Sequence, residues 1–153
     1  MPNKSNKQLR LQNYLPYRLS VAANAVSELI ARAYEDQFDL SIPQWRLLAV
    51  LADEEPLTQQ ALCGRTRMDK VTVMRAARGL QQRHLVKRLP NATDGRSHRL
   101  VMTDAGKRLY GQIAPLALDY EAKLLADIES KDIARLERLL KQLEQTASML
   151  SQK

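Results

Sequence analysis

TQQALCGRTRMDKVTVMRAARGLQQ, residues 58–82, is the stretch that decides the fold. Thr58 and Asp69 are residue types that commonly cap the N-terminus of a helix. They predict one short helix over residues 59–65 and a second over residues 70–83, joined by a tight connection. Two short helices joined in this way form a helix-turn-helix.

The residues after this stretch predict a β-hairpin. Residues 85–89 and 99–102 are rich in β-prone side chains, and the segment between them contains Pro90 and the Asp94-Gly95 pair, which favour a turn. A hairpin directly after a helix-turn-helix makes a winged helix, with the hairpin as its wing. We therefore expect a mainly α-helical fold with a small β-hairpin wing.

Two helical patterns precede the helix-turn-helix in the sequence. Apolar residues recur every three or four positions over residues 16–37, which predicts one long amphipathic helix with a proline in its first turn. Ser41 and Gln44 have the spacing of a capping box, so another helix is expected over residues 42–52. Its expected buried stripe consists of Trp45, Leu48 and Leu51.

Two further helices are expected after the wing. Thr103 can cap the first, which runs to about residue 128 and could bend at Pro115, and Ser130 can cap the second. The last helix carries an apolar seam, which packs either within its own chain or on a second copy. The flanking helices have little core of their own to cover, so we expect a homodimer. The expected dimerisation residues are Leu15, Leu19, Ile133, Leu136, Leu140, Leu143 and Leu150.

The predicted domains are thus an N-terminal arm and dimerisation helix (1–40), a winged helix-turn-helix (41–103) and C-terminal dimerisation helices (104–153). We expect neither an enzyme nor a cofactor, because His84 and His98 have no partner motif and no metal-binding cluster is present. The single cysteine, Cys63, fits a reducing compartment. The N-terminus lacks the apolar core of a signal peptide, and the longest apolar run is too short to span a bilayer. A cytoplasmic protein without a membrane partner is therefore expected.

Positive charge is concentrated in one window. Between Cys63 and Arg99 the chain has ten Lys or Arg residues against two acids, so that this window carries +8 while the remaining residues sum to −1. Such a patch is typical of a protein that binds a polyanion. The basic residues fall on two helices and a turn instead of one amphipathic helix, which favours nucleic acid over a membrane surface.

The predicted second helix of the helix-turn-helix has a face suited to DNA. With Val73, Ala77 and Leu80 turned inward, the outer face carries Val71 and the two arginines Arg75 and Arg78. Arginine can bind base acceptors in the major groove, and Val71 can contact a thymine methyl group. A merely solvated face is the alternative, but such faces normally mix both charges. The candidate DNA-binding residues are Arg65, Arg67, Lys70, Val71, Thr72, Arg75, Arg78, Arg88, Asp94, Arg96 and Ser97.

At the hairpin tip, Arg96 could enter the minor groove while Asp94 orients its guanidinium. The alternative is that this pair only stabilises the turn by an exposed ion pair.

Five motifs together resemble the MarR family of bacterial transcription regulators. They are Leu57-Thr58, MDKVTV (68–73), LQQRHLVKR (80–88), DGRS (94–97) and LVMTDAG (100–106). The resemblance implies a winged-helix homodimer whose N- and C-terminal helices interlock and whose recognition helices enter successive major grooves of a near-palindromic operator. His84 departs from the family's usual glycine and would fit a left-handed conformation, and Gly95 departs from its usual arginine.

The resemblance also implies control of DNA binding by a small molecule or by cysteine oxidation. Cys63 lies in the first helix of the helix-turn-helix, away from the family's reactive position, so redox control is not expected. Rings and cations near the family's effector pocket would suit an aromatic carboxylate, although each ring could simply be core packing. These residues are Tyr14, Tyr17, Arg18, Trp45 and Arg46.

The predicted function is therefore a sequence-specific double-stranded DNA-binding regulator. Repression with release by an effector is expected, because a dimer that covers a promoter blocks polymerase without further machinery. The alternative is a non-specific architectural winged-helix protein that binds DNA or RNA.

Overall fold

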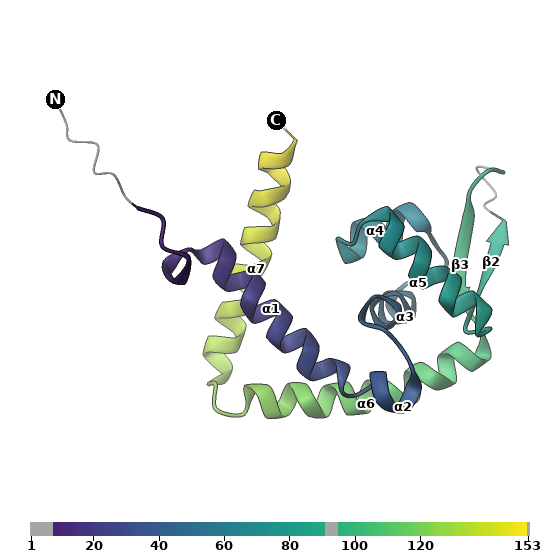
Figure 1. Cartoon of the computed structure of the whole chain (residues 1–153), viewed down its shortest axis with the longest axis horizontal. Coiled ribbons are helices and arrows are strands. Elements are labelled where there is room, and N and C mark those ends of the chain that lie inside the picture. Colours follow the sequence, from purple (N-terminus) through teal and green to yellow (C-terminus); the bar gives the residue numbers. More distant parts are fainter. Residues whose placement is uncertain (1–7, 91–94, 153) are drawn as a thin grey trace. The chain divides into compact units, whose positions relative to one another are not determined.

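The computed structural model describes residues 8–90 and 95–152 (Figure 1). It divides into one unit up to residue 117 and another from residue 118. The first unit begins with a short 3₁₀ helix, Leu11–Asn13, and the helices α1 (Leu15–Ala31) and α2 (Glu35–Phe38). Its winged module contains α3 (Ile42–Asp53), β1 (Leu57–Thr58), α4 (Gln59–Thr66), α5 (Lys70–Gln82), β2 (Val86–Pro90) and β3 (His98–Met102). Helix α6 (Asp104–Leu125) crosses the division, and α7 (Ser130–Ser151) belongs to the second unit.

The predicted helix-turn-helix is confirmed. Thr58 Oγ1 accepts a hydrogen bond from the Ala61 N–H at 3.1 Å and caps α4. The capping box of α3 is also present, with the Gln44 N–H bound to Ser41 Oγ at 3.3 Å and the Ser41 N–H bound to Gln44 Oε1 at 3.0 Å. The three helices α3, α4 and α5 pack around fully buried side chains, namely Leu47, Leu48, Leu51, Leu62, Val73 and Leu80. Trp45, expected in the buried stripe of α3, is only half-buried, and Leu47 is buried in addition to Leu48 and Leu51.

The wing is a hairpin of β2 and β3, as predicted, with Val86 opposite Met102 and Pro90 opposite His98. A third strand, β1, was not expected from the sequence; its two residues pair with β3 and give the strand order β1-β3-β2. Glu55 strengthens this attachment, because its carboxylate accepts the Met102 N–H at 2.9 Å. The wing is therefore joined to the connection between α3 and α4.

The prediction of one helix over residues 16–37 is wrong. Helix α1 ends at Ala31, and the N–H groups of residues 32–34 donate to carbonyls three residues back before α2 begins. This turn buries Ala31, Ala33 and Tyr34, which a helix with one apolar face could not bury together. Tyr34 is only 1% exposed and stacks on Trp45, with ring centroids 5.3 Å apart.

The helices after the wing follow the prediction in part. Thr103 Oγ1 accepts the Gly106 N–H at 3.1 Å and so caps α6, which passes through Pro115 and ends at Leu125. The prediction that Ser130 caps the last helix is wrong: Glu129 is the N-cap, because its carbonyl accepts the N–H groups of Asp132 and Ile133. The described helices include none with the length and apolarity required to cross a membrane.

Candidate nucleic-acid interface

Helix α5 has a well-defined first turn. Asp69 accepts two hydrogen bonds from Thr72, one from its N–H at 2.8 Å and one from its hydroxyl at 2.6 Å. These bonds hold the pKa of the Asp69 carboxyl below its ordinary value. In a helix-turn-helix the first residues of this helix contact base edges, so the cap fixes the part of α5 that would enter the major groove.

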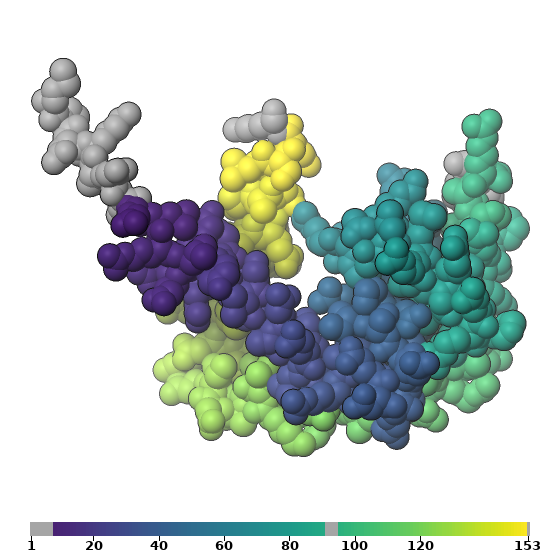
Figure 2. Space-filling model, in the orientation of Figure 1, coloured from purple at the N-terminus to yellow at the C-terminus, as the bar shows by residue number. Residues whose placement is uncertain are grey.

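The two faces of α5 are as predicted. Val73, Ala77 and Leu80 are buried, whereas Val71, Arg75 and Arg78 are exposed. Lys70 is exposed at the first position and Thr72 is half-exposed beside it. An apolar inner face thus holds a cationic outer face toward solvent. Figure 2 shows the teal surface of α4 and α5 bordering the green ridge of the wing.

A groove lies between α5 and the wing, and we call it the α5–wing groove. Three arginines contribute to it, Arg78 from α5, Arg88 from β2 and Arg96 from the hairpin, and among the residues that the structure describes no acid lines it. The structure thus brings together four predicted residues, the three arginines and Ser97. The other lining residues were not predicted as DNA contacts: Thr58, Gln59, Gln60, Met74, Ala77, Gln81, His98 and Leu100.

The polar start of α4 is the main feature that sequence reasoning missed. Thr58 was recognised only as a cap, yet Thr58, Gln59 and Gln60 all line the α5–wing groove. Side chains of these types commonly contact phosphate oxygens. The buried Gln59 Nε2 has no hydrogen-bond partner among the described residues. The run Thr-Gln-Gln at a helix start was the signal that could have identified these residues as candidates.

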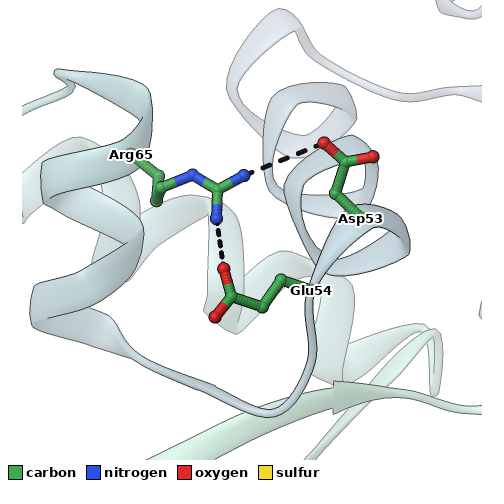
Figure 3. Close-up of polar contacts among 3 residues, drawn as sticks. All are labelled: Asp53, Glu54 and Arg65. Atoms are coloured by element: carbon green, nitrogen blue, oxygen red, sulfur yellow. Dashed lines mark hydrogen bonds and ion pairs between the residues drawn. The ribbon is translucent and has the colours of Figure 1, made fainter.

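Two arginines of the basic window, residues 63–99, already bind other groups of the protein. Arg65 forms ion pairs with Glu54 and, at 3.8 Å, with Asp53 (Figure 3). Arg83 donates to the carbonyls of Asp39 and Phe38 at 2.7 and 2.9 Å, at the end of α2. The structure therefore does not place Arg65 among the groove residues, and its charge is balanced by acids outside the window.

Two further residues singled out by the sequence, Arg67 and His84, follow the two helices of the helix-turn-helix. Arg67 follows α4 in a left-handed conformation, φ 58°, in the connection to α5. His84 adopts the left-handed conformation expected for it, φ 56°, and its carbonyl accepts the Thr103 hydroxyl at 2.7 Å. Asp94 lies outside the described residues.

The five proposed effector residues fall into two groups, one on α3 and one near the start of α1. Trp45 is stacked between Tyr34 and Tyr110, with centroid distances of 5.3 and 5.5 Å. Arg46 Nη2 donates to Ser27 Oγ at 3.1 Å and so links α3 to α1. Burial raises the pKa of Tyr34 to about 12, which keeps its hydroxyl protonated.

By contrast, Tyr14, Tyr17 and Arg18 lie exposed near the start of α1. Within the described part of the chain, no ring contact or hydrogen bond joins Tyr14 or Tyr17 to Trp45. Tyr34 and Tyr110 were not predicted as neighbours of Trp45, because their contacts depend on tertiary packing.

The predicted dimerisation residues are largely uncovered in the single chain. Leu15 and Leu19 are exposed on α1 in the first unit. In the second unit Leu136, Leu140, Leu143 and Leu150 are exposed on α7, and Ile133 is half-exposed. Apolar surface on this scale is typical of a face that packs on a partner.

The fold, together with the cationic outer face of α5, defines a winged helix-turn-helix protein. Residues 38–97, which span most of the winged module, match the model of the MarR family. It is 28% identical over 123 residues to YwoH, an uncharacterized HTH-type transcriptional regulator of Bacillus subtilis strain 168, with 78% of this chain and 89% of YwoH covered.

Solved structures share the fold along most of the chain. A MarR/EmrR family transcriptional regulator from Acinetobacter sp. ADP1 superposes with a TM-score of 0.84 at 22% identity, covering 92% of this chain and 99% of that one. CouR from Rhodococcus jostii RHA1, solved bound to p-coumaroyl-CoA, superposes with a TM-score of 0.76 at 16% identity, covering 89% and 95% of the two chains.

Proposed function

We propose that the protein is a homodimeric, sequence-specific double-stranded DNA-binding repressor that a small aromatic effector releases from its operator. The observation that carries this proposal is the capped helix α5, which directs Val71, Arg75 and Arg78 away from the core beside the α5–wing groove. Cationic side chains on such a helix match the acceptors and phosphates of a major groove.

The α5–wing groove fits the path of a DNA strand. With α5 in the major groove and the wing in the adjacent minor groove, one sugar–phosphate strand must pass between them. Arg78, Arg88 and Arg96 line this path, together with the amides and hydroxyls at the start of α4. Arg75 lies outside this set of groove residues and is the candidate for reading a base.

A homodimer would present two such helices. The exposed leucines of α1 and α7 are apolar surfaces that a second copy could cover. Recognition helices separated by about 34 Å would enter successive major grooves, which requires a near-palindromic operator. A dimer bound over a promoter would exclude polymerase.

Selection from a random duplex library tests sequence specificity. The selected site should be an inverted repeat, and the protein should prefer it to a scrambled duplex by roughly 10³ or more. Arg75→Ala should weaken specific binding by about 1–3 kcal/mol and relax base preference at one position in each half-site. Arg96→Ala should weaken all duplexes evenly and flatten the salt dependence. Equal binding to selected and scrambled duplexes would favour the architectural alternative.

The effector is proposed to be an aromatic carboxylate or its thioester. Trp45 and Arg46 are consecutive residues of α3, Arg46 is exposed, and the structurally similar CouR was solved with p-coumaroyl-CoA. Thermal unfolding with p-coumarate and p-coumaroyl-CoA tests the idea, since a ligand of the folded state raises the unfolding temperature. Arg46→Ala should lose the shift, whereas Arg135→Ala on α7 should keep it. If neither compound stabilises the protein or releases its DNA, an effector of this class is excluded.

A further inference from the structure

Helix α5 leaves two large apolar side chains in solvent. Val71 is 61% exposed and Met74 is 41% exposed, whereas Val73, Ala76, Ala77 and Leu80 of the same helix are buried. The two exposed residues have different surroundings. Met74 lines the α5–wing groove with Arg78, whereas Val71 is not among the groove residues and lies in the first turn.

We propose that Val71 reads the 5-methyl group of a thymine in each half-site, which rests on the proposed DNA-binding function. Thymine is the base that presents a methyl group in the major groove. Valine cannot form a side-chain hydrogen bond, so packing it on the polar edge of another base would desolvate donors or acceptors without replacing their bonds. Thymine is therefore the base whose major-groove edge matches the apolar side chain of Val71.

The local structure restricts the backbone and side-chain conformation of Val71. It is the second residue of α5, between the N-cap Asp69 and Thr72, whose N–H and hydroxyl both bind that cap. A β-branched side chain in a helix has one strongly preferred rotamer, so little side-chain entropy is lost when the methyl groups meet a base. Residues in this first turn are the ones that reach base edges in a helix-turn-helix.

The same helix also fixes a spacing. Arg75 follows Val71 by four residues, a rise of about 6 Å along the helix axis. Because successive bases on one strand are about 3.4 Å apart along the duplex, the two side chains would address positions about two steps apart. Arginine prefers the O6 and N7 acceptors of guanine. Each half-site should therefore combine a thymine and a guanine at that separation.

Deoxyuridine substitution tests the inference directly, because it removes only the methyl group. In the selected operator each thymine is replaced in turn, and binding of the full-length protein is measured by fluorescence anisotropy. One position in each half-site should lose about fourfold in affinity, the equivalent of burying one methyl group. Val71→Ala should bind that deoxyuridine operator and the original operator equally well.

Met74→Ala is the matched control, since it also shortens an exposed apolar side chain of α5 but on the groove side. It should retain the fourfold discrimination, and thermal unfolding should show both variants folded. A Val71→Ala variant that still discriminates, or an operator with no sensitive thymine, would overturn the inference. Those results would leave the proposed function intact, because that function fails only if no duplex sequence is preferred.

Discussion

Gly106 and Gly111 lie on the same helix, α6, and we predict opposite effects for the same substitution. A Cβ atom built on Gly106 would lie 2.1 Å from the Leu85 carbonyl oxygen and 3.1 Å from its carbon, whereas at Gly111 it would meet nothing within 4 Å. The Leu85 carbonyl also accepts the Thr103 N–H at 3.0 Å, so this is where the start of the hairpin meets α6. Because of this hydrogen bond, a shift of the Leu85 carbonyl would also disturb the start of α6.

The expected magnitudes follow from these contacts. Replacing glycine by alanine inside a helix stabilises it by about 1 kcal/mol when space is available, which is the prediction for Gly111→Ala. At Gly106 the same gain is opposed by overpacking, which costs about 1–3 kcal/mol, so the net result should be a loss of up to about 2 kcal/mol. Because the helix gain is common to both variants, their free energies of unfolding should differ by the overpacking cost, about 1–3 kcal/mol.

Urea unfolding followed by circular dichroism measures this difference. All variants should be compared at one protein concentration, because association would shift the transition midpoint. For a chain of this size, each kcal/mol should also shift the melting temperature by about 2–4 °C. A Gly106→Ala protein as stable as Gly111→Ala would refute the close approach of α6 to Leu85.

Three further predictions concern association, pH and charge. Replacing Leu136 and Leu140 by glutamate should convert the proposed dimer to monomer in sedimentation, and an unchanged mass would remove α7 from the proposed interface. Because its pKa is lowered in the folded state, Asp69 should stabilise the protein above the unfolded-state pKa and lose that effect as pH falls through the folded-state value; in acid titrations monitored by circular dichroism, Asp69→Ala should show less of this loss. Arg65→Ala should weaken operator binding less than Arg75→Ala in anisotropy titrations, because Arg65 is already paired with acids; an equal or larger loss would contradict this.

Except for the cap of α7, features of the fold that depend on neighbouring residues could be predicted from the sequence. The caps at Thr58 and Asp69 and the capping box of α3 are determined by residues at most three positions apart, and all of them are present. The break between α1 and α2 was missed because it depends on burying Tyr34 against Trp45. Strand β1 was missed because two residues carry no periodic pattern, and pairing with β3 alone makes them a strand.

In the candidate site, too, features set by local sequence were predicted and features set by tertiary contacts were missed. Helical rotation was enough to separate the buried face of α5 from its exposed face, so Val73 and Arg75 were assigned correctly. The α5–wing groove joins the start of α4 to α5 and to the hairpin, and sequence spacing does not reveal that approach. Gln59 was missed as a site residue for this reason.

Tertiary contacts also determine which basic residues of the window 63–99 are available to DNA. Arg65 pairs with acids 11 and 12 positions earlier, and Arg83 binds carbonyls 44 and 45 positions earlier, so both cations already have partners before any DNA is bound. Releasing either one to a phosphate would cost the bonds it already makes, whereas Arg78 and Arg88 already line a groove whose described residues include no acid. The count of ten basic residues is therefore an upper limit on phosphate contacts, and tertiary pairing determines which of them can contribute to the salt dependence of binding.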